Sequence, residues 1–465
     1  MKKLSKNFLS LFMSDVASRL LGFIAVAYIA RLLGIEGLGQ IRYGFAFLNY
    51  ALLFANPGLT TIGAREIAKD THNRRVIDEV MGLRIFLSGL ILLLFVVGLF
   101  FIPGQTVTKN IILLYVLSLI PFAFLMEFVL QGREEMEYIG ISRLIQYGLY
   151  IVFLFIFLRN TKDILMVPVS FLIGYAAAAG FLFSIFLKRY RYPTPKFSLH
   201  HWHHLLIVSI PVGLATIFNQ VSVNLPPITL GVFHSKAEVG AFSAGFAVIV
   251  MLLIVERVFY YVFFPVLSRQ YIHEPKKLTG SFTILTRLLF SITIPLTVGG
   301  MLVAPKLIYL IYGAGYEGSV AIFRILLVYF LIAPITTIFG YGLVAINQER
   351  RFFKVVTITG IINFLLIILL GVNFRGIGAA AAFCVSELIA VVFMKRELKK
   401  FVSFEVIQYV IKPVVAAFVM AIILHVFRDW HVIALVVVGI LVYVLILYLI
   451  KGFSQEEIKK LKRAV

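Results

Sequence analysis

The chain has 465 residues, of which 61% are hydrophobic and 14% are charged. Its mean hydropathy of +0.99 excludes an ordinary soluble globular protein, which is about half apolar and a quarter charged. The net charge of +21 does not indicate nucleic-acid binding, because the cations lie in short segments between apolar runs and not in one basic domain.

The apolar runs predict an all-α polytopic membrane protein with about fourteen spanning helices, since one span needs ~20 mostly apolar residues. The first run, from Phe8 to Leu33, is too long for a signal peptide and is interpreted as a span. The predicted spans lie near residues 9–33, 44–63, 85–102, 110–130, 144–158, 164–187, 205–230, 239–266, 288–311, 320–346, 355–372, 377–394, 409–426 and 431–450.

The cations between the spans predict the sidedness of the chain. With the N-terminus in the cytoplasm, the cytoplasmic segments hold 30 of the 43 Lys and Arg residues and the opposite segments hold 8. Because cytoplasmic loops carry an excess of Lys and Arg, we expect an even number of spans and both termini in the cytoplasm. The implied location is the cytoplasmic (inner) membrane of a bacterium or archaeon.

Two internal matches indicate a duplicated unit of six helices. At an offset of 201, one match pairs Gly39, Gly44, Phe45 and Ala46 with Gly240, Gly245, Phe246 and Ala247. At an offset of 217, the other pairs Gln131 and Arg133 with Gln348 and Arg350. Six helices return the chain to the same side, so the copies would be parallel repeats; chance similarity of Gly- and Ala-rich helices is the alternative. The predicted domains are an N-lobe at 1–197, a C-lobe at 198–400, and two extra helices with a tail at 401–465.

Charged side chains within the spans are the first candidate functional residues, because each costs ~2.5–3.5 kcal/mol at mid-bilayer and normally faces protein or water. In the first span, Asp15, Ser18 and Arg19 recur at helical spacing and form a polar stripe. Asp15 and Arg19 are four residues apart and are placed to pair. Two interpretations stay open, a structural ion pair or a cavity-facing guanidinium that would bind a diphosphate through bidentate hydrogen bonds.

Further candidates come from other spans. Arg257 is expected to line the same cavity, whereas Arg31 and Arg324 lie near span ends, where snorkelling is the simpler explanation. A polar stripe on the seventh span favours a water-lined surface over mere helix association; its candidates are Thr216, Asn219, Gln220 and Asn224. The second span adds Asn49 and Asn56. Pro226-Pro227 should bend or break the seventh span.

Several stretches resemble polysaccharide-type flippases of the multidrug/oligosaccharidyl-lipid/polysaccharide exporter superfamily. The clearest are AYIARLLGIEGLGQIRYGFAFLNY (27–50), NPGLTTIGAREIAK (56–69) and LGVFHSKAEVGAFSAGFAV (230–248). Weaker ones are LQGREEMEYIG (130–140), YGAGYEGSVAIFRIL (312–326) and AINQERRFF (345–353). The resemblance implies two pseudo-symmetric six-helix lobes around a central cavity, plus two C-terminal helices. It also implies movement of an undecaprenyl-diphosphate-linked oligosaccharide from the cytoplasmic to the outer leaflet by alternating access.

Three alternatives are weighed against this interpretation. Ser18 to Phe23 resembles part of the lipid II flippase pattern, but Ile24 and Ala25 replace its expected Arg-Asp, which favours a place outside that branch. A cation-coupled multidrug exporter would need a carboxylate-dominated site, supported mainly by Asp15. A membrane-embedded glycosyl-transfer enzyme would need acidic residues on long outer loops, which are short here.

The predicted protein is therefore a transporter and not an enzyme. Its expected partners are the lipid-linked oligosaccharide, membrane lipids and polysaccharide biosynthesis enzymes, with no nucleic acid. We find no nucleotide-binding motif and expect no cofactor and no metal site; coupling to a monovalent cation or to the membrane potential is left open.

Overall fold

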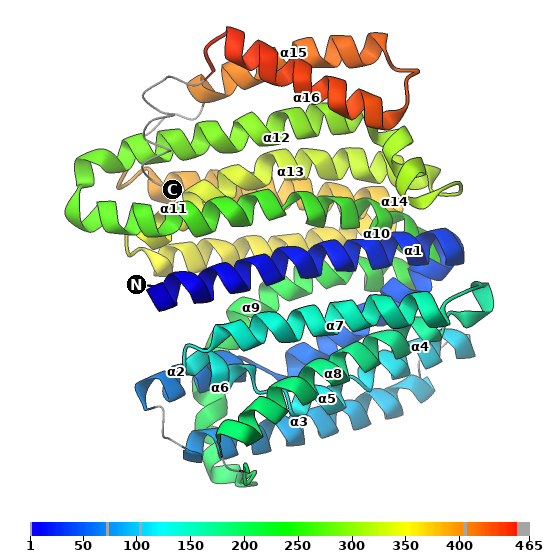
Figure 1. Cartoon of the computed structure of the whole chain (residues 1–465), viewed down its shortest axis with the longest axis vertical. Coiled ribbons are helices and arrows are strands. Elements are labelled where there is room, and N and C mark those ends of the chain that lie inside the picture. The colour runs from blue at the N-terminus through cyan, green and yellow to red at the C-terminus, as the bar shows by residue number, and fades with distance from the viewer. Residues whose placement is uncertain (1, 71–73, 102–104, 191, 403–406, 453–465) are drawn as a thin grey trace. The chain divides into compact units, whose positions relative to one another are not determined.

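The computed structural model describes residues 2–70, 74–101, 105–190, 192–402 and 407–452, with only the main chain described in parts of some helices. Every regular element within these ranges is a helix (Figure 1). The packing divides the chain into two units, Met1–Ser243 and Ala244–Val465, which are joined through α10 (Lys236–Leu252). The division into lobes at residues 197 and 400 stays a prediction.

The helices of each unit follow in chain order. The first unit holds α1 (Lys2–Ala55), α2 (Leu59–Lys69), α3 (Arg74–Phe101), α4 (Thr106–Val116), α5 (Leu119–Ala123), α6 (Glu127–Gly132), α7 (Met136–Phe157), η1 (Thr161–Asp163), α8 (Met166–Arg189), α9 (Leu199–Phe233) and the start of α10. The second unit holds the rest of α10, α11 (Ile254–His273), α12 (Pro275–Tyr312), α13 (Glu317–Ala345), α14 (Glu349–Leu398), α15 (Ile407–Val426) and α16 (Val432–Leu449).

The number of spans is compatible with the predicted fourteen. Eleven helices in the described ranges are long and apolar enough to cross a membrane. Two of them, α1 with 54 residues and α14 with 50, each combine two helices across non-helical residues, at Gly34 and at Phe374-Arg375. Dividing both and adding the 35-residue α9 reaches the predicted number. The all-α polytopic fold is confirmed.

The chain turns at Gly34, where a loop was expected between the first two predicted spans. Its φ of 70° lies in a region that glycine adopts easily and other residues rarely do, so the chain changes direction at one residue and the helix restarts at once. Residues 35–43, which lie in the predicted outer loop between the first two spans, are helical. Arg42 is therefore half-buried on a helix, which corrects its assignment as an outer-loop cation.

The segment after Gly34 packs against the start of α10, backbone to backbone. A Cβ atom on Gly39 would collide with the carbonyl oxygen of Lys236, and one on Gly240 would collide with that of Ile35. Both pairs keep the offset of 201 found in the sequence. These two segments thus meet through a reciprocal contact, which is the form that a parallel repeat about a local two-fold axis would have; the duplication itself stays a prediction.

The second sequence match lies beside two helix ends of the same geometry. Glu134 and Asn347 both have a φ of 59° and end α6 and α13 in the same way, since Glu135 N–H donates to Leu130 O and Gln348 N–H donates to Leu343 O, each at 2.8 Å. These Schellman turns are 213 residues apart, whereas the sequence match has an offset of 217, so the register of this match stays a prediction.

Two further expectations about breaks are corrected. The predicted span at 110–130 is divided into α4, α5 and α6. In contrast, α9 runs without interruption through Pro226 and Pro227, so the predicted break is absent. Prolines are tolerated in spanning helices where neighbouring elements satisfy the freed backbone groups, and α9 packs against α1, α2 and α3.

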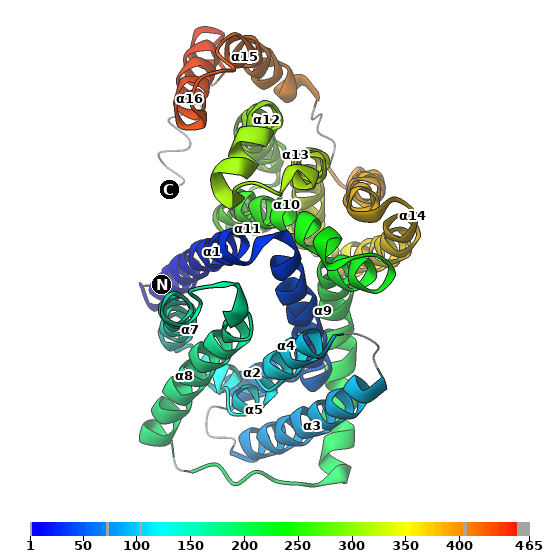
Figure 2. The same cartoon turned by 90° about the vertical axis from the view of Figure 1, so that its right-hand side faces the viewer.

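Each unit has its own apolar core. In the first unit, α7 packs between α1 and α8, and α4 also contacts α1 and α8 (Figure 2). In the second, α11, α12, α13 and α14 enclose one apolar cluster that includes Phe282 and Leu343, and α12, α15 and α16 enclose another around Met420 and Leu435. These packed helices hold the polar groups described next.

Candidate functional site

The polar stripe of the first span contains the expected ion pair. Arg19 Nε donates to Asp15 Oδ2 at 3.1 Å, and the two side chains are 25% and 21% exposed. Ser18 is buried, and its hydroxyl has no hydrogen-bond partner among the described residues. The predicted pairing of Asp15 with Arg19 is confirmed. The ion pair uses Nε of Arg19, so the other N–H groups of its guanidinium can donate to a further anion.

A tyrosine of α7 stands beside this stripe. A Cβ atom on Gly22 would lie 3.5 Å from Cε1 of Tyr147, so the ring packs directly on α1. The guanidinium groups of Arg19, Arg42 and Arg143 and the carboxyl group of Asp15 all lie within electrostatic reach of the Tyr147 hydroxyl. We call the three arginines around this hydroxyl the arginine cluster; they come from both halves of α1 and from α7.

Two members of the arginine cluster lack a counterion. Within the described ranges, neither Arg42 nor Arg143 forms a hydrogen bond or an ion pair. Arg42 also acts on the hydroxyls of Tyr115 and Tyr150, which places it inside the first unit among α1, α4 and α7. Three guanidinium groups with one carboxylate partner leave an excess of positive charge, which suits an anionic ligand.

Arg42 and Arg143 are not among the site residues predicted from the sequence, because both lie outside the predicted spans. For Arg143 a signal was present: Arg143 and Tyr147 are four residues apart in a helix and so share a face. Arg42 lay two residues outside its predicted span, and only the structure shows that the segment after Gly34 is helical.

A third arginine, Arg84, was also assigned to a loop but is fully buried in α3. Its Nη1 donates to Leu125 O and its Nη2 donates to Thr60 Oγ1 at 2.9 Å. Its guanidinium lies 5.1 Å from the ring centre of Phe122 and 5.0 Å from that of Phe128. These contacts join α2, α3, α5 and α6, so Arg84 is held in a structural role.

Several polar side chains of the predicted stripes form local hydrogen bonds, and their role as a water-lined surface stays a prediction. Asn49 Nδ2 donates to Phe45 O at 3.0 Å. Asn56 lies in the break after α1, where its Oδ1 accepts from Thr60 N–H at 3.1 Å, so it does not share a helix face with Asn49 as expected. On α9, Asn224 Nδ2 donates to Gln220 O at 2.8 Å. The side chains of Thr216 and Asn219 lie outside the described residues.

The remaining predicted arginines have exposed side chains. Arg324 Nε donates to Met301 O at 3.1 Å, while Arg31 and Arg257 are exposed on α1 and α11. Arg257 belongs to the second unit and Arg19 to the first, so a joint role around one diphosphate stays a prediction. Within the described ranges no group of three or more His, Cys, Asp or Glu side chains is placed to hold a metal ion.

Comparisons of sequence place this arrangement among proteins of surface-polysaccharide synthesis. A family described as polysaccharide biosynthesis protein matches residues 4–271. A putative O-antigen transporter of Escherichia coli (strain K12) is 22% identical over 83% of this chain and 94% of its own length. The capsular polysaccharide biosynthesis protein CapF of Staphylococcus aureus is 23% identical over 84% of this chain and 99% of its own.

Comparisons of structure identify the fold. The lipid II flippase MurJ in an inward closed conformation aligns with a TM-score of 0.78 over 95% of this chain and 98% of that chain, at 17% identity. An inward-facing multidrug resistance transporter of the MATE family aligns with a TM-score of 0.62 over 85% of this chain and 99% of that chain, at 16% identity. Identities this low show a shared fold alone.

Proposed function

This chain belongs to the polysaccharide biosynthesis protein family, and we propose that it is a flippase that moves an undecaprenyl-diphosphate-linked oligosaccharide from the cytoplasmic to the outer leaflet. Its helical fold is that of the MurJ and MATE transporters. The relatives named for O-antigen transport and capsular polysaccharide synthesis support a lipid-linked sugar as the cargo. The chemistry of a flippase is movement across the membrane, and no bond of the substrate is made or broken.

The observation that carries the proposal is the arginine cluster beside Tyr147. A lipid-linked oligosaccharide has an apolar tail, neutral sugars and a diphosphate. Burying that diphosphate without compensating charge would cost several kcal/mol or more. Guanidinium groups bind phosphate oxygens in bidentate geometry and remain charged at every physiological pH. Arg42 and Arg143, which lack a carboxylate partner in the described chain, supply that compensation.

In the proposed cycle, each side chain has a separate task. Arg42 and Arg143 bind the diphosphate, and Arg19 joins them while Asp15 fixes its side chain through the 3.1 Å ion pair. The tail stays in lipid, and alternating access exposes the head group first to one side and then to the other. Asp15, the main support for a multidrug exporter, is engaged with Arg19, which weakens that alternative.

The test is transport by the full chain in proteoliposomes that contain an undecaprenyl-diphosphate-linked oligosaccharide. We expect Arg42→Ala and Arg143→Ala each to lower the transport rate by roughly 10-fold or more, because a hydrogen bond to a charged group contributes about 1.5–3 kcal/mol and 1.4 kcal/mol corresponds to about 10-fold. The rate is measured as the fraction of head groups accessible from outside the vesicle.

Two controls define the outcome. Arg65→Ala removes a guanidinium whose side chain is 52% exposed in a surface pair, and it should transport normally. Arg19→Lys should recover little of the activity lost in Arg19→Ala, since lysine lacks the planar fork. Normal transport by a folded Arg42→Ala, Arg143→Ala double variant would refute the anion-binding role.

A further inference from the structure

The second unit contains two carboxyl groups, on α11 and α14, that lie within electrostatic reach of each other. Glu256 lies on α11 and Glu387 on the second half of α14, and the charge of Glu387 acts on Glu256. Thr337 Oγ1 of α13 donates to Glu256 Oε2 at 3.2 Å. Tyr329, also on α13, lies within electrostatic reach of both carboxyl groups. We call Glu256 and Glu387 the acidic pair.

The acidic pair has no counterion. Within the described chain, neither carboxyl group forms an ion pair with a lysine, arginine or histidine. The neighbouring cation, Arg257, is exposed and points about 100° away from Glu256 around the helix. The groups that face the pair are Tyr329, Thr336 and Thr337 of α13 and Cys384 of α14, none of which is cationic.

One carboxylate oxygen of this site, Glu256 Oε1, is closed off from solvent and has no hydrogen-bond partner among the described residues. The hydroxyl of Thr336 lies beside the carboxyl group of Glu387. Buried oxygens are normally satisfied. A carboxylate oxygen can only accept a hydrogen bond, whereas a protonated carboxyl group also donates one. One added proton therefore supplies the donor that this site lacks.

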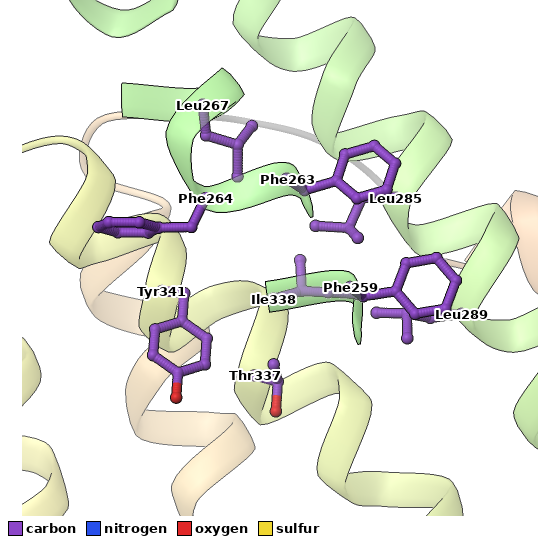
Figure 3. Close-up of a pocket in the computed structure, with 9 residues that line it drawn as sticks. All are labelled: Phe259, Phe263, Phe264, Leu267, Leu285, Leu289, Thr337, Ile338 and Tyr341. Atoms are coloured by element: carbon purple, nitrogen blue, oxygen red, sulfur yellow. The ribbon is translucent and has the colours of Figure 1, made fainter. Parts of the chain in front are cut away.

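The surroundings are apolar on the side of α11 and α12. Thr337 forms part of the wall of a pocket whose other residues are Phe259, Phe263, Phe264, Leu267, Leu285, Leu289, Ile338 and Tyr341 (Figure 3). Two ionised carboxylates within electrostatic reach of each other in such surroundings repel each other and are poorly solvated, which favours protonation of one of them.

We propose that Glu256 and Glu387 form a proton-binding site in the second unit, in which the two carboxyl groups hold at least one proton that is exchanged with water during the transport cycle. The proton enters from water on one side, binds to a carboxylate oxygen and leaves to water on the other side, with no other reactant. The proposal has a binding part, that the pair holds a proton, which does not depend on the identity of the cargo. Its coupling part, that the proton is exchanged during transport, rests on the proposed flippase function.

The binding part is tested without substrate, by infrared spectroscopy of the full chain at pH 7. Protonated carboxyl groups absorb separately from carboxylates, and we expect a protonated band that is lost in Glu256→Gln combined with Glu387→Gln. Glu274→Gln is the control, because the hydrogen bond from Lys277 lowers the pKa of Glu274 and its loss should leave the band unchanged. The absence of the band in the native chain, its persistence in the double variant, or its loss when sodium replaces potassium would each overturn the proposal.

The coupling part is tested in proteoliposomes with an imposed pH difference. One pH unit corresponds to about 10-fold in an equilibrium ratio per proton, so we expect the distribution of the lipid-linked oligosaccharide between leaflets to shift by up to about 10-fold per pH unit. The double variant should give the same distribution with and without the pH difference, and a gradient response in that variant would contradict coupling through this pair. A chain that shows the infrared band but moves no oligosaccharide would refute the flippase function and leave the proton site standing.

Discussion

Arg84 illustrates at the scale of one residue how a charged group can serve the fold. It makes two hydrogen bonds and lies over two aromatic rings inside the first unit. We expect Arg84→Ala to lower the free energy of unfolding by roughly 3 kcal/mol or more, because each hydrogen bond to a charged group contributes about 1.5–3 kcal/mol. The measurement is the thermal unfolding midpoint of the purified protein in detergent.

The matched control is Arg65→Ala. Arg65 pairs with Glu66 at 3.1 Å on the surface, and exposed pairs contribute little to stability. We therefore expect a midpoint close to that of the native chain. Arg84→Lys should recover only part of the loss, since one ammonium group cannot reproduce the fork that reaches Leu125 O and Thr60 Oγ1. Equal midpoints for Arg84→Ala and Arg65→Ala would contradict the structural role.

The arginines also show where sequence reasoning ended. The charge on Asp15 and Arg19 and their spacing were enough to predict an ion pair, because both lie well inside one long helix. Arg42, Arg84 and Arg143 lie within a turn of a predicted span boundary, where a hydropathy pattern cannot separate a loop cation from a buried one. Tertiary packing decides that difference, and spacing along one helix carries no information about it.

At the scale of elements, the break between α1 and α2 is held by a side chain. Asn56 Oδ1 accepts from Thr60 N–H, and Asn56 Nδ2 donates to Thr60 Oγ1 at 2.9 Å. Because an uncapped helix start loses about 0.5–2 kcal/mol, Asn56→Ala should lower the free energy of unfolding by that amount. Asn56→Asp keeps the acceptor and should recover most of it, as measured by thermal unfolding. If Asn56→Asp unfolds as readily as Asn56→Ala, the capping role is wrong.

Most helices were predictable from the sequence, whereas most of the connections between them were not. Long apolar runs identified the spans, because the membrane sets a minimum length for each helix. The connections depend on single residues: Gly34 turns the chain without a loop, whereas Pro226 and Pro227 leave α9 continuous. A glycine or a proline in the sequence does not by itself predict a turn, because packing against neighbouring helices decides whether the chain turns there or continues as a helix.

At the scale of the whole molecule, the distribution of cations predicts how the chain sits in its membrane. Since 30 of the 43 Lys and Arg residues lie on one predicted side, a reporter fused after Asn160 should give an outer signal and one fused after Lys451 a cytoplasmic signal. Asn160 lies between α7 and α8, and Lys451 follows α16. A cytoplasmic signal after Asn160 or an outer signal after Lys451 would contradict the topology.

The reciprocal contact, in which Gly39 meets Lys236 and Gly240 meets Ile35, has the form of an interface between two identical subunits. In a homodimer, both subunits are encoded by one gene, so every substitution appears in both subunits. The two segments of this chain are encoded separately, so each can change without the other. The charged groups of the two units differ: the arginine cluster lies in the first unit and the acidic pair in the second.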